Sequence, residues 1–170
     1  MTLQATAKLM GGGSAKISGT FMPNTGVDIY AKASGAASYS LLDSVTTDDE
    51  GEYGAAYTIK KTTSFLAKSA GLSSKVDTTQ VYSTVTLTAK SYSKSRATLS
   101  ANGSPSAKGT LTFYRSVAGK DPILKSMTSN ASGNGTVTVK LPKGTRSVYV
   151  IFKAPGTGAG TSKTVKVKVK

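Results

Sequence analysis

The stretch Gly135-Thr136-Val137-Thr138-Val139-Lys140-Leu141 alternates polar and apolar side chains from Thr136 to its end. Successive side chains of a β-strand point to opposite faces, so this alternation is typical of a strand with one buried and one solvated face. The stretch Val85-Thr86-Leu87-Thr88-Ala89 has the same pattern. No segment keeps a period of 3.6 residues over three turns. The sequence therefore predicts an all-β fold.

Clusters of glycine, asparagine, serine and proline separate these stretches, as in Met22-Pro23-Asn24-Thr25-Gly26. Such clusters favour tight turns. Comparison of the sequence with itself shows one order of elements twice: a polar turn with glycine, a strand, a basic turn, an aromatic strand and a glycine. This order starts at Thr46 in the first half and at Thr128 in the second. We expect two domains, residues 1–82 and 83–170.

Two motifs of the repeat are similar to known proteins. The segment Gly26-Val27-Asp28-Ile29-Tyr30 matches Gly109-Thr110-Leu111-Thr112-Phe113-Tyr114, and each half also has the polar turn followed by two strands. This pattern resembles bacterial Ig-like repeats, which occur in cell-surface proteins and in structural proteins of tailed phages. The resemblance implies two tandem immunoglobulin-like β-sandwiches. It implies no particular function, because such sandwiches serve many.

The net charge of the chain comes entirely from its second half. The net charge is +14, and residues 1–82 hold 7 basic and 7 acidic residues. Residues 83–170 hold 15 basic residues and one acidic residue, Asp121. A domain of this charge favours anionic partners.

The last predicted strand, Thr164 to Lys170, alternates valine with lysine and would place a row of lysines on one sheet face. An alternative reading is a solvated edge strand that its lysines protect from aggregation. The basic residues that we expect to contact an anionic surface are Lys140, Lys143, Arg146, Lys163, Lys166, Lys168 and Lys170.

The composition argues against catalysis. The chain has no cysteine, histidine or tryptophan. Without histidine there is no Ser–His or Cys–His pair, and the commonest general acid–base group is missing. The absence of cysteine excludes disulfides and thiol chemistry. We expect a protein that is not an enzyme and has no cofactor.

One acidic cluster is a weak candidate for a calcium site, because hard cations prefer several oxygen ligands on a tight turn. It consists of Asp48, Asp49, Glu50 and Glu52 around Gly51. The matching turn of the second repeat, Asn130 to Asn134, has no charged residue. The turn can therefore form without a metal, and a solvated turn is the favoured interpretation.

Nucleic acid and membrane are less favoured partners. Only Arg96, Arg115 and Arg146 could make bidentate contacts to phosphate, and no helix is expected that could enter a major groove. No run approaches the roughly 20 apolar residues that span a bilayer. We expect neither nucleic-acid binding nor membrane insertion.

Two functions fit these features. The first is a tailed-phage virion component, either a capsid decoration protein or an Ig-like tail or head-fibre protein. It would dock on the assembly through one repeat and project the other, with major capsid or tail proteins, or copies of itself, as partners. The start at Met1 without a secretory signal favours this location in the virion. The alternative is an exported, extracellular bacterial cell-surface or adhesin module that binds anionic wall polymers.

Overall fold

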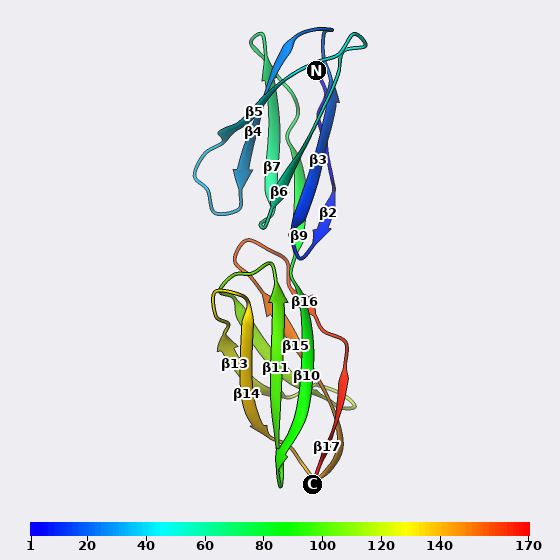
Figure 1. Ribbon diagram of the computed structural model, residues 1–170, viewed down its shortest axis with the longest axis vertical. Coiled ribbons are helices and arrows are strands. Elements are labelled where there is room, and N and C mark those ends of the chain that lie inside the picture. Colours follow the sequence, from blue (N-terminus) through cyan, green and yellow to red (C-terminus); the bar gives the residue numbers. More distant parts are fainter. The chain divides into compact units, whose positions relative to one another are not determined.

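The computed structural model describes residues 1–170, and all of its regular secondary structure is β-strand (Figure 1). The predicted all-β fold class is confirmed. The chain forms two compact units, Met1–Tyr82 and Ser83–Lys170, here called unit 1 and unit 2. It has no helix that is long and apolar enough to cross a membrane.

Unit 1 is a sandwich of two sheets. The smaller sheet has the order β1-β3-β6, with strands β1 (Gln4–Ala5), β3 (Gly13–Thr20) and β6 (Glu52–Ile59). The larger sheet has the order β2-β9-β7-β4-β5, and β8 also pairs with β7. Its strands are β2 (Lys8–Met10), β4 (Gly26–Ala33), β5 (Ser40–Thr46), β7 (Thr63–Ser69), β8 (Leu72–Ser73) and β9 (Asp77–Tyr82). The core between the sheets includes Ile17, Val27, Ile29 and Phe65.

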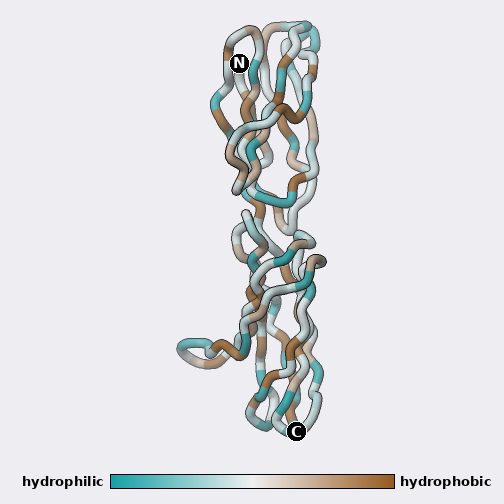
Figure 2. Tube along the Cα trace, turned by 90° about the vertical axis from the view of Figure 1, so that its left-hand side faces the viewer, coloured by the Kyte–Doolittle hydropathy of each residue, from teal (hydrophilic) through white to brown (hydrophobic).

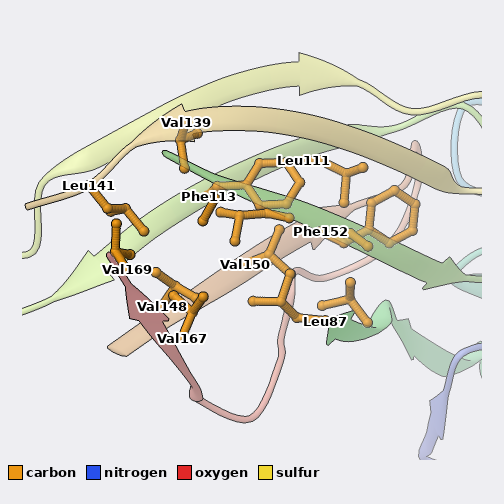
Figure 3. Packing of buried hydrophobic residues seen from close by; sticks show 14 of the residues in the cluster. Leu87, Leu111, Phe113, Val139, Leu141, Val148, Val150, Phe152, Val167 and Val169 are labelled. Atoms are coloured by element: carbon orange, nitrogen blue, oxygen red, sulfur yellow. The ribbon is translucent and has the colours of Figure 1, made fainter. Parts of the chain in front are cut away.

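Unit 2 repeats this architecture. One sheet has the order β10-β11-β14, with strands β10 (Thr84–Ser93), β11 (Arg96–Ser104) and β14 (Asn134–Lys140). The other has the order β13-β12-β15-β16, and β17 also pairs with β15. Its strands are β12 (Thr110–Ser116), β13 (Ile123–Thr128), β15 (Gly144–Lys153), β16 (Gly160–Thr161) and β17 (Val165–Val169). Figure 3 shows Phe113, Phe152, Leu111 and Val150 gathered in the core of this unit.

The alternation seen in the sequence places side chains as expected. In β14, Val139 is buried while Thr138 and Lys140 are exposed. In β17, Val167 and Val169 are buried and the lysines between and beside them are exposed. Each valine that leaves water stabilises the unit by roughly 1.5–3 kcal/mol. The valines therefore hold β17 on the core, and the lysines are left free for other roles.

The repeats align with one difference from the sequence comparison. Gly26 pairs with Thr46 at the start of β4, and Thr110 pairs with Thr128 at the start of β12. Gly26 therefore corresponds to Thr110, and Gly109 corresponds to Thr25. The match of Gly26 to Gly109 is one residue out of register, because Gly26 is the first residue of β4 whereas Gly109 precedes β12.

Both units also share a buried serine that the sequence comparison did not single out. Ser74 Oγ accepts a hydrogen bond from Ala67 N (3.0 Å) and donates one to Lys75 O (2.8 Å). Ser162 Oγ makes the same two contacts, with Val150 N (3.1 Å) and with the carbonyl of the following residue (2.9 Å). The hydroxyl satisfies backbone groups in the segment between the last two strands, which is β8 to β9 in unit 1 and β16 to β17 in unit 2.

Candidate anion-binding surface of unit 2

The predicted lysine row follows β17 at one edge of its sheet. β17 forms ladder hydrogen bonds with β15 alone, in a register that places Lys166 opposite Ser147 and Lys168 opposite Thr145. Directly opposite residues share a face, so the two lysines stand beside hydroxyl side chains on the outer face of the sheet. This face can offer ammonium groups and hydroxyl groups together.

Three segments meet at the end of unit 2 that carries the C-terminus (Figure 1). Ser95, in the β10–β11 turn, donates from its N–H to Lys170 O (3.2 Å), and its carbonyl accepts from Leu141 N (3.0 Å). A cavity of about 560 Å³ lies among these segments. We call it the lysine cup; its lining is Lys94, Ser95, Lys143, Gly144, Lys168, Val169 and Lys170. Hydrophilic residues lie on the turns of this end in Figure 2.

More cations flank the lysine cup. Arg96 and Lys140 are a directly opposed pair on β11 and β14, next to the two turns. Arg146 is opposite the buried Val167, so it lies on the core side of β15. Its Nε donates to Pro142 O (3.1 Å), and its Nη2 donates to Lys143 O. The guanidinium therefore holds the β14–β15 turn closed and adds charge beside the lysine cup.

The structure brings three of the seven predicted basic residues together in the lining of the lysine cup. Lys143, Lys168 and Lys170 line the lysine cup, with Lys140, Arg146 and Lys166 nearby on its strands. Lys163 follows the buried Ser162 between β16 and β17 and does not line it. Lys94 was missed by the sequence analysis, because only the pairing of Ser95 with Lys170 places this turn beside the chain end.

The single acidic residue of unit 2 does not neutralise this end. Asp121 lies in the β12–β13 loop, where its carboxylate accepts from Val117 N (2.8 Å) and from Tyr149 Oη (3.0 Å). Partial burial raises the pKa of Tyr149, and its hydrogen bond to Asp121 raises that pKa further. The Tyr149 ring stacks on Tyr114 at 5.0 Å between centroids. The Asp121 carboxylate is thus already hydrogen-bonded to Val117 and Tyr149.

The acidic turn of unit 1 uses its first carboxylate internally. Asp48 Oδ1 accepts from Glu50 N (3.1 Å) and from Glu52 N (2.7 Å). Asn130 Oδ1 accepts two equivalent backbone bonds in unit 2, at 3.0 and 2.9 Å. Asp49 accepts from the side chain of Asn24. No group of three or more acidic side chains is arranged to hold a metal ion, and the turn has the same hydrogen bonds with and without charge.

Comparison with known proteins identifies the fold. No protein-family model and no curated protein sequence matches the chain. The chicken interferon gamma receptor alpha chain matches with a TM-score of 0.51 and 10% identity over 99% of this chain and 97% of that one. The fibronectin(III)-like modules of Clostridium thermocellum CbhA match with a TM-score of 0.41 and 20% identity, over 99% and 94% of the two chains.

These matches concern the fold alone. The protein consists of tandem fibronectin type III or immunoglobulin-like β-sandwiches, as the repeat pattern predicted. Folds of this kind serve many unrelated functions, and the function resides in particular surfaces.

Proposed function

We propose that the protein is a non-enzymatic docking component of a tailed-phage virion, either a capsid decoration protein or a tail or head-fibre protein. Unit 2 docks on an anionic face of the major capsid or tail proteins, and unit 1 is presented to the outside. One observation carries the proposal: unit 2 has 15 basic residues against one acidic residue, while unit 1 has 7 of each. The motif resemblance to Ig-like phage proteins supplies the virion context.

Docking through unit 2 is driven by the electrostatic free energy of its many basic residues. Cations that lie close together repel one another, and an anionic partner relieves this repulsion on binding. The attraction also speeds association and falls as salt is added. Unit 1 has no such imbalance and gains nothing comparable from an anionic surface.

The absence of histidine and cysteine supports a non-enzymatic role. The basic set favours an acidic protein surface over nucleic acid, because lysine predominates over arginine, which makes the bidentate contacts to phosphate. The aromatic pair Tyr114 and Tyr149 stack on each other, so these two rings are engaged with one another instead of forming a platform for bases.

A second candidate is an exported cell-surface module that binds anionic wall polymers. The regular spacing of Lys166, Lys168 and Lys170 along β17 favours it, because a polymer with repeating charges can match a row. Both candidates use the same unit and differ in the partner.

Cosedimentation separates the two candidates. The full-length protein is mixed at physiological salt with cognate phage heads or with purified bacterial wall sacculi. We expect saturable binding to heads that weakens steeply with salt. Binding to sacculi alone would contradict the virion role and favour the surface module.

A further inference from the structure

The end of unit 2 has a counterpart in unit 1 that carries a different set of lysines. Gly11 N donates to Tyr82 O (2.7 Å), as Ser95 N does to Lys170 O. The strand registers equate Gln80 with Lys168 and Tyr82 with Lys170. The chain turns at Gly11-Gly12 between β2 and β3 in unit 1, and at Lys94-Ser95 between β10 and β11 in unit 2. Unit 1 therefore forms this end of the fold without equivalents of Lys94, Lys168 and Lys170.

The lysine side chains of the lysine cup have no Asp or Glu partner within the chain. None of the four forms an ion pair or a side-chain hydrogen bond. Asp121, the single acidic residue of the unit, is bound to Tyr149. Four ammonium groups around one cavity repel each other, so their placement costs free energy that the fold does not require. A bound anion would offset that cost.

The shape of the lysine cup indicates a compact ligand. It is bounded by two turns and the chain end, and it has a volume of about 560 Å³, so it is not a long groove along a strand. Its wall includes Gly144, where an added Cβ would approach only the Arg146 guanidinium, at 3.6 Å. That space admits the tip of a turn together with a few of its side chains.

We propose that the lysine cup is a binding site for an acidic turn of a partner protein, whose carboxylates bind Lys94, Lys143, Lys168 and Lys170. This inference rests on the proposed function and names the chemistry of the docking partner. Lysine binds carboxylates as a point charge and does not demand the fixed geometry of an arginine fork, which suits side chains on a turn. Arg146 is engaged with the β14–β15 turn and acts by positioning it.

The test uses full-length protein and a fluorescent cyclic peptide with four glutamates on a turn, at 0.15 M salt. One variant changes the lysine cup: Lys94→Gln, Lys143→Gln, Lys168→Gln and Lys170→Gln. A matched control removes the same charge from exposed sites of unit 2 outside it: Lys108→Gln, Lys120→Gln, Lys125→Gln and Lys153→Gln. All eight side chains are exposed, so both variants should fold, which thermal melting checks.

We expect the lysine cup variant to bind the peptide at least about tenfold more weakly than the wild type, and the control to lose less than about threefold. Backbone amide shifts on titration with the peptide should centre on Ser95, Gly144 and Val169. A second titration replaces the peptide with inorganic tripolyphosphate, and weaker binding than that of the peptide is expected.

Four results would overturn the inference. Equal loss in both variants means that net charge, and not the lysine cup, binds the anion, and the proposed docking through unit 2 survives. Tighter, lysine-cup-dependent binding of tripolyphosphate means a phosphate site. Wild-type protein that binds cognate heads but not the peptide refutes the acidic turn alone, whereas failure to bind heads, sacculi and peptide refutes the proposed function as well.

Discussion

Unit 1 and unit 2 build equivalent cores by exchanging large and small residues. In unit 2, Gly103 lies under the ring of Phe152, and a Cβ at Gly103 would come within 2.4 Å of that ring. The strand registers equate these positions with Phe21 and Ser69 of unit 1. The ring comes from β15 in unit 2 and from Phe21, the residue after β3, in unit 1.

A second exchange involves a directly opposed pair on the smaller sheets. Gly19 faces Tyr53 in unit 1, and Ala101 faces Gly135 in unit 2. A Cβ at Gly19 would lie 2.4 Å from the Tyr53 hydroxyl, which donates to Thr2 O at 2.5 Å. At Gly135 the space is filled by Leu111 instead. The two repeats thus keep the same strand pairing and vary which strand supplies the large side chain.

The largest expected effect breaks the Gly103–Phe152 match. Gly103→Phe should destabilise unit 2 by about 3 kcal/mol through overpacking, and Phe152→Ser by about 3–5 kcal/mol through the lost ring. The double variant has the residues that unit 1 has at these two positions. It should be destabilised by less than the sum of the two single variants. Urea unfolding of the three variants measures this coupling. Strict additivity would show that the two positions do not share one space.

The next effect concerns the shared serine. Ser162→Ala leaves the N–H of Val150 without its partner in the core and should cost about 1–3 kcal/mol. Ser74→Ala should cost unit 1 a similar amount, because its contacts are the same. Exposed Ser132→Ala is the control and should stay within about 0.5 kcal/mol of the wild type. A loss in only one unit would mean that the shared geometry has different energetic roles.

The turn at Asp48 should respond more weakly. Asp48→Asn copies unit 2 and should change stability by less than about 0.5 kcal/mol, while Asp48→Ala removes the acceptor of two N–H groups and should cost about 1 kcal/mol. Thermal melting with calcium or with a chelator should give one midpoint. A calcium-dependent rise that Asp48→Asn abolishes would establish the metal site that the turn was weakly predicted to form.

The smallest effect concerns Tyr57 of unit 1 at alkaline pH. Burial, with the charge and hydrogen bond of Asp43, raises the pKa of Tyr57 to about 12 from 10.0. Because the pKa is higher in the folded state, this contribution to stability is present below pH 10 and is lost as the pH rises towards 12. Tyr57→Phe should flatten the pH dependence of unit 1 in that window and leave unit 2 unchanged, as followed by NMR. An unchanged profile for unit 1 would exclude this role.

The sequence predicted what depends on local pattern. The alternation of valine and lysine from Val165 to Lys170 correctly placed the buried and exposed faces of β17, and the polar turns aligned Asp48 with Asn130. The sequence comparison did not reveal that Phe21 in unit 1 replaces Phe152 in unit 2. The two rings come from different segments of the repeat, and only the strand pairing relates their positions. Lys94 was missed for the same reason, since the lysine cup joins three segments that lie far apart along the chain.

The most direct test of docking through unit 2 compares the cosedimentation of three full-length proteins with cognate heads. These are the wild type, the lysine cup variant, and a unit 1 variant with Lys8→Gln, Lys16→Gln, Lys60→Gln and Lys61→Gln, all at exposed sites. Equal charge is removed in both variants. We predict that the unit 1 variant binds like the wild type and that the lysine cup variant loses binding. Equal loss in both variants, or a larger loss in the unit 1 variant, would contradict docking through unit 2.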